Sequence, residues 1–73
     1  MLHTPTFGAA SGTVTEFDSP AGLGVITADD GATYPFHCTA IADGTREIAP
    51  GRTVTFTIAA GHRGRLEATD ISS

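Results

Sequence analysis

The side chains best suited to chemistry in this sequence are three histidines, one cysteine and four arginines. His3, His37 and His62 are scattered without the short spacings typical of zinc ligands, so we expect no metal site. Cys38 shows no paired base that would activate it, and we expect a small packing residue there. No triad, metal set or phosphate-binding loop is visible. The sequence therefore predicts a protein that is not an enzyme and that uses no cofactor or small-molecule substrate.

Half of the cations fall in one short segment. His62, Arg63 and Arg65 follow Gly61 in a glycine-bearing loop, and a loop of this kind at the mouth of a barrel can hold phosphate groups. The alternative is an ordinary solvated loop. Arg52, just before an alternating segment, extends this positive patch only if the fold brings it near.

Composition and charge narrow the class of protein. The chain has 73 residues, 40% hydrophobic and 16% charged, with a net charge of -4. This length supports one small core and excludes a second domain. An acidic chain is a poor candidate for strong nonspecific adhesion to phosphate backbones, because that affinity comes from cations. A locally positive groove is nevertheless compatible with a negative total.

The cysteine count and the apolar runs bear on location. A lone Cys38 cannot form an internal disulfide and fits a reducing compartment. Apolar runs are far shorter than the roughly 18 residues of a membrane helix. The first residues lack the basic head and apolar stretch of a secretion signal. We therefore expect a cytoplasmic protein with no membrane partner.

Short segments rich in Thr, Val, Ile and Phe alternate with glycine-bearing turns from Gly12 onward, as in small all-β barrels. We expect residues 1–11 to form an irregular arm and residues 12–71 to form the domain. The fourth segment is the clearest strand, because three apolar residues alternate with threonines. The expected strands span residues 13–17, 23–27, 32–39, 53–58 and 66–71. This inventory predicts an all-β fold, a five-stranded antiparallel OB-fold barrel.

Two residues interrupt the strand pattern. Gly24 indicates a bulge or a close backbone approach. Pro35 cannot donate to a ladder, so it marks an edge strand or a bulge. Tyr34 and Phe36 face inward if His37 faces outward, by simple alternation. A bulge at Pro35 would instead turn those two rings toward the surface.

The segment from Gly12 to Ile26 reads Gly-Thr-Val-Thr-Glu-Phe-Asp-Ser-Pro-Ala-Gly-Leu-Gly-Val-Ile. It resembles, without a gap, the opening of bacterial cold-shock domains, Gly-Lys-Val-Lys-Trp-Phe-Asn-x-x-Lys-Gly-Phe-Gly-Phe-Ile. Residues 34–41 are similar to the family's Val-Phe-Val-His-Phe-Ser-Ala-Ile segment, and residues 50–64 to its fourth strand and following turn. The resemblance covers Gly12 to Ile71, with one residue fewer after Ile41 and one more near Arg65.

This resemblance implies binding of single-stranded RNA or DNA, whose bases stack on exposed aromatic side chains surrounded by cations. Phe17 and His37 are retained at matching positions, which implies that they bind nucleic acid, with His62, Arg63 and Arg65 nearby. Most other aromatics are replaced, and each loss forfeits about 1–3 kcal/mol per base. The replacing residues are Glu16, Leu23, Val25, Pro35 and Cys38. Glu16 also repels phosphate, so we expect weak or altered single-strand binding.

The same residues allow other roles. His37 can be a partly exposed polar residue of a strand, and Phe17 can belong to the core. The rival function is a protein-interaction module that self-associates or binds a protein partner and has lost nucleic-acid binding. Its surface would be an apolar patch, as at many interfaces, formed by Leu23, Val25, Pro35 and Cys38.

Overall fold

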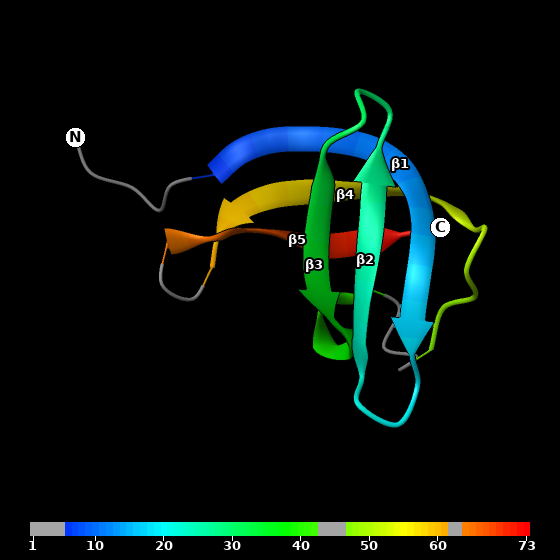
Figure 1. Cartoon of the computed structure of the whole chain (residues 1–73). Coiled ribbons are helices and arrows are strands. Elements are labelled where there is room, and N and C mark those ends of the chain that lie inside the picture. The colour runs from blue at the N-terminus through cyan, green and yellow to red at the C-terminus, as the bar shows by residue number, and fades with distance from the viewer. Residues whose placement is uncertain (1–5, 43–46, 62–63) are drawn as a thin grey trace.

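A computed structural model describes residues 6–42, 47–61 and 64–73 of the chain, apart from the side chains of Thr6 and Phe7. It contains five strands and one short 3₁₀ helix (Figure 1). These elements are β1 (Thr6–Asp18), β2 (Leu23–Ala28), β3 (Thr33–His37), η1 (Cys38–Ala40), β4 (Thr53–Ala60) and β5 (Leu66–Ser72). Within the described ranges the helical content is limited to η1, so no helix there could span a membrane.

The five strands form one antiparallel sheet in the order β3-β2-β1-β4-β5. The long β1 pairs with β4 along its first half and with β2 along its second, and Figure 1 shows it curving from one layer to the other. Gly12 lies where the two pairings overlap, and a Cβ there would come within 2.3 Å of the Thr27 carbonyl oxygen. The predicted five-stranded antiparallel OB-type fold is confirmed.

The barrel closes around a small apolar core. A parallel bridge between Ile41 and Ile71 joins the end of η1 to β5. The alternation predicted for β4 is observed, since Val54 and Phe56 are buried and the third residue of the series, Ile58, packs half-buried against the core. The buried core residues are Val14, Ile26, Ala28, Phe36, Ile41, Ile48, Val54, Phe56, Ala68 and Ile71.

The start of the chain differs from the expected irregular arm. Residues 6–11 belong to β1, and Ala9 pairs with Thr57 on β4. Gly8 adopts a φ of +100° beside a register shift, and this irregularity breaks the alternation that would mark a strand in the sequence. Residues 1–5 of the expected arm lie outside the described residues.

The third strand is shorter than predicted. It ends at His37 rather than at Thr39, because the chain turns into η1. The Nδ1 atom of His37 accepts a hydrogen bond from the Thr39 amide at 3.2 Å, the role of a helix N-cap.

Candidate nucleic-acid interface

A β-bulge in β1 decides which side chains reach the surface. Val14 pairs with Ile26 and Glu16 pairs with Val25, so two residues of β1, Thr15 and Glu16, oppose one residue of β2. Both are exposed, and the alternation restarts one residue later. The bulge therefore places Glu16 outside and Phe17 inside, where strict alternation from the buried Val14 would bury the carboxylate.

Beyond the bulge, two rows of paired residues cross β1, β2 and β3. One row is Glu16, Val25 and Pro35, and the other is Asp18, Leu23 and His37. Side chains two residues apart on a strand share a face, so the two rows point the same way. We call these six residues the outer face: Glu16, Asp18, Leu23, Val25, Pro35 and His37. The usual spacing of strands and residues makes the outer face about 10 Å wide across the strands and about 7 Å long along them, which is the size of one nucleobase.

A third row lies beneath the outer face and supports it. Phe17, Gly24 and Phe36 are paired across the three strands, and the two rings stack with centroids 6.0 Å apart at 12°. A Cβ on Gly24 would lie 2.4 Å from the Phe36 ring and 2.8 Å from the Glu16 carbonyl oxygen. Of the two options for Gly24, the structure shows close approach, since the register around it is regular.

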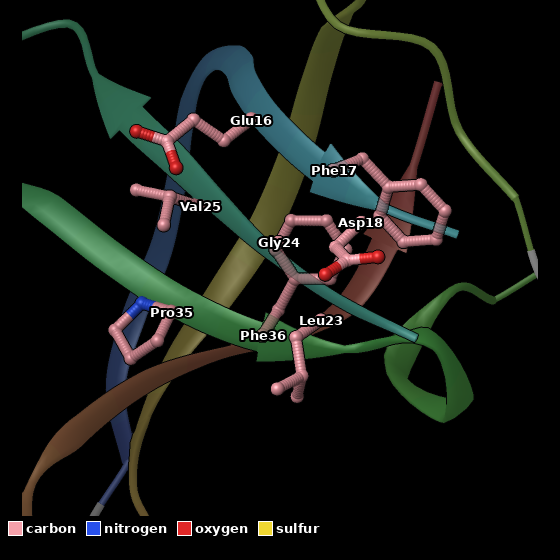
Figure 2. A pocket seen from close by; sticks show the side chains of 8 residues that line it. All are labelled: Glu16, Phe17, Asp18, Leu23, Gly24, Val25, Pro35 and Phe36. Atoms are coloured by element: carbon pink, nitrogen blue, oxygen red, sulfur yellow. The ribbon is translucent and has the colours of Figure 1, made fainter. Parts of the chain in front are cut away.

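The outer face is hollowed over this row. An open cavity of about 390 Å³ is lined by Glu16, Phe17, Asp18, Leu23, Gly24, Val25, Pro35 and Phe36. Figure 2 shows these side chains, with both carboxylates projecting from β1. Phe17 is half-buried, so it packs on Phe36 and also lines the cavity. Phe17 therefore packs in part against the core, and its nucleic-acid contact stays a prediction.

His37 is exposed at one corner of the outer face. Its Nδ1 accepts the Thr39 amide and lies 3.0 Å from the Thr39 hydroxyl. A neutral imidazole that accepts at Nδ1 carries its proton at Nε2. The other ring nitrogen of His37, Nε2–H, is therefore a hydrogen-bond donor.

The charged residues around the outer face are acidic. A second cavity, of about 230 Å³, extends past β3 and is lined by Leu23, Pro35, Phe36, His37 and Glu67. Among the residues that the structure describes, three carboxylates and no arginine line the two cavities. Arg65 is exposed immediately before β5, two residues from Glu67. The other two residues of the predicted cation cluster, His62 and Arg63, lie outside the described residues.

The structure also bears on the sequence predictions for Pro35 and Cys38. Pro35 lies in an edge strand without a bulge, so Phe36 is buried and Tyr34 packs against Phe56 with ring centroids 5.7 Å apart. Cys38 is a half-buried free thiol that packs against the core at η1, below Gly22. It is therefore the one member of the predicted apolar patch that lies apart from the other three. In the described part of the chain, no three His, Cys, Asp or Glu side chains are grouped to hold a metal ion.

Sequence reasoning missed the bulge that builds the outer face. The signal was present in the spacing of the apolar residues of β1: Val14 and Phe17 are three apart, and an odd spacing cannot place both side chains on one face of a regular strand. Asp18 was also missed as a residue of the face, because the Asp-Ser-Pro-Ala-Gly run that it opens is a turn signal.

Comparison with known proteins identifies the family. A family model of the 'cold-shock' DNA-binding domain matches residues 10–73. Glycine-rich protein 2 of Nicotiana sylvestris is 42% identical over 65 residues, which cover 86% of this chain and 30% of that protein. The chain thus spans under a third of the length of this relative. The barrel, the spacing of its motifs and these matches agree, and the chain belongs to the cold-shock DNA-binding domain family, a family of nucleic-acid-binding proteins.

Proposed function

We propose that this protein binds single-stranded RNA or DNA weakly, across the outer face of β1, β2 and β3. The observation that carries the proposal is the open cavity of the outer face, whose exposed apolar surface lies on the same face as His37. Leu23 is 53% exposed there, and aliphatic side chains give a base an apolar support. Phe17 offers part of one ring, and His37 offers Nε2–H. Arg65, which is exposed immediately before β5, supplies a phosphate contact, and the contacts predicted for His62 and Arg63 belong to the same proposal.

The expected weakness has two physical causes. Aliphatic side chains at Leu23, Val25 and Pro35 give less stacking than aromatic rings, which contribute about 1–3 kcal/mol per base. The carboxylates of Glu16, Asp18 and Glu67 around the cavities repel phosphate. Low ionic strength leaves both this repulsion and the attraction of the remaining cations least screened, so the salt dependence of Kd reports which of them dominates.

The proposal places the chain as a divergent member of its family, with ribonucleoprotein-like motifs that have lost most of their aromatics. The gapless likeness of residues 12–26 to the bacterial motif supports a bacterial type. A role in binding, rather than in catalysis, accords with the family. The free thiol of Cys38 supports a reducing, cytoplasmic location.

The test is a titration of labelled dT and rU heptamers followed by fluorescence anisotropy at about 10 mM salt. Two exposed leucines provide matched variants, because Leu23 lies on the outer face and Leu66 lies on β5 outside both cavities. Leu23→Ala is expected to weaken binding at least threefold and Leu66→Ala to leave it unchanged. No anisotropy change up to high micromolar wild-type protein, with these heptamers or with a dT heptamer that carries a central deoxyguanosine, would refute the proposed function.

A second candidate function is protein interaction, favoured by the same exposed Leu23 beside Val25 and Pro35. Contiguous exposed apolar surface marks many interfaces. Sedimentation velocity across a concentration series distinguishes the candidates. Self-association that Val25→Asp abolishes would support a homomeric interface, whereas a monomer at all concentrations would exclude one.

A further inference from the structure

We propose that Glu16 and Asp18 make the outer face select guanine and reject thymine and uracil. This inference rests on the proposed function, because it concerns which base lies in the cavity of the outer face. Because aliphatic side chains replace aromatic rings on the outer face, stacking contributes less to binding there. Hydrogen bonds to base edges therefore account for more of the discrimination between bases.

The two carboxylates border the cavity along one strand. The bulge turns Glu16 outward, and Asp18 follows it on the same face, with Val25 and Leu23 as their partners on β2. A base resting on the two aliphatic side chains therefore has one edge toward β1 and the other toward β3. Both side chains are exposed, and a carboxylate can only accept hydrogen bonds.

The four bases differ in what they offer to such acceptors. Guanine presents two adjacent donors, N1–H and the N2 amino group, which one carboxylate can accept together. Cytosine and adenine each present an amino donor beside an acceptor nitrogen. Thymine and uracil present a single N3–H between two carbonyl oxygens, which a carboxylate repels. The acidic border of the cavity thus favours guanine most and thymine or uracil least.

The side of the outer face on β3 offers a hydrogen-bond donor. His37, across the sheet on β3, has its Nδ1 engaged by Thr39 and carries its proton at Nε2. The N7 acceptor of guanine lies on the far side of the purine from its N2 amino group. A guanine held by the carboxylates therefore turns an acceptor toward the edge of the outer face on which His37 lies. Acceptors on β1 and a donor on β3 match this purine at both edges.

The test compares three labelled DNA heptamers by anisotropy at about 10 mM salt: all-thymidine, the same with a central deoxyguanosine, and the same with a central deoxyinosine. Inosine keeps N1–H but lacks the N2 amino group. A good bidentate contact corresponds to at least a fivefold change in Kd. We expect the guanine heptamer to bind at least fivefold more tightly than the thymidine heptamer, with inosine between them.

Amide variants separate recognition from general electrostatics. Glu16→Gln combined with Asp18→Asn is expected to tighten thymidine binding and bring the ratio of guanine to thymidine affinity close to one. Asp70→Asn is the matched control, because Asp70 is an exposed carboxylate on β5 outside both cavities. Its φ of +51° also suits asparagine. The control is expected to keep the wild-type ratio.

The outcomes separate this inference from the proposed function. Equal or tighter binding of the all-thymidine heptamer would overturn guanine selection and leave single-strand binding standing. A guanine preference that survives the double amide variant would also overturn it. Binding of none of the heptamers would overturn the proposed function. If an oligoarginine peptide then bound saturably, the acidic outer face would belong to a basic protein partner instead.

Discussion

Replacement of Glu16 by tryptophan tests how the outer face limits affinity. Glu16 is exposed beside the cavity, and its row continues through Val25 and Pro35. A larger side chain there meets solvent rather than core, so the fold should tolerate it. The change removes a repulsive carboxylate and adds a ring on which a base can stack, and the size of each effect can be worked out separately.

The charge effect is the smaller one. A strand spacing of about 4.8 Å puts a phosphate that follows β2 about 6 Å from a carboxylate on β1. Two unit charges about 6 Å apart in water interact by about 0.7 kcal/mol, which is a factor of about three before screening. Glu16→Gln should therefore tighten binding of a thymidine heptamer about two- to threefold at 10 mM salt. At 150 mM the gain should shrink, because the Debye length falls from about 30 Å to about 8 Å.

The stacking effect should add to it. One base on an aromatic ring contributes about 1–3 kcal/mol, so Glu16→Trp should bind the heptamer at least another fivefold more tightly than Glu16→Gln. Anisotropy titrations of the wild type and both variants, with thermal melts to confirm the fold, make the comparison. If a folded Glu16→Trp protein bound no more tightly than Glu16→Gln, bases would not approach this row, and the reasoning would be refuted.

Four further changes test the support beneath the outer face and the cation beside it. Gly24→Ala should lower the free energy of unfolding by about 1–3 kcal/mol in urea titrations, because its Cβ meets the Phe36 ring and the Glu16 backbone. Gly61→Ala should cost less, since the nearest atoms belong to the movable carboxylate of Glu67; equal costs would contradict the packing argument. Phe36→Leu should lower the free energy of unfolding by about 1 kcal/mol through loss of its stacking on Phe17, and an unchanged urea midpoint would count against that contact. Arg65→Gln should reduce the slope of log Kd against log salt by about 0.7, and an unchanged slope would mean that Arg65 contacts no phosphate.

Much of the fold could be predicted from the sequence because its signals are local. The alternation of Val54 and Phe56 fixed the buried face of β4, and the glycine-bearing turns separated the strands. Pro35 marked the edge strand, since proline has no amide proton to donate to a neighbouring strand. Each of these features can be recognised from the residue types within one short segment.

The candidate site was harder to predict, because it depends on register. The bulge at Thr15 and Glu16 shifts the alternation of β1 by one residue, and its direct signal is only the odd spacing of two apolar side chains. The start of β1 was missed for a similar reason, since the irregularity at Gly8 hides the pairing with β4. Both positions depend on partners distant in the sequence.

The most direct test of the central claim is a ¹⁵N–¹H correlation spectrum of the protein titrated with a single-stranded heptamer. The account predicts chemical-shift changes concentrated at the outer face, at Leu23, Val25 and His37, and at the supporting Gly24. The amide of Asp70 on β5 should remain in place. Shifts confined to β4 and β5, or a spectrum unchanged at millimolar heptamer, would contradict the claim that β1, β2 and β3 carry nucleic-acid binding.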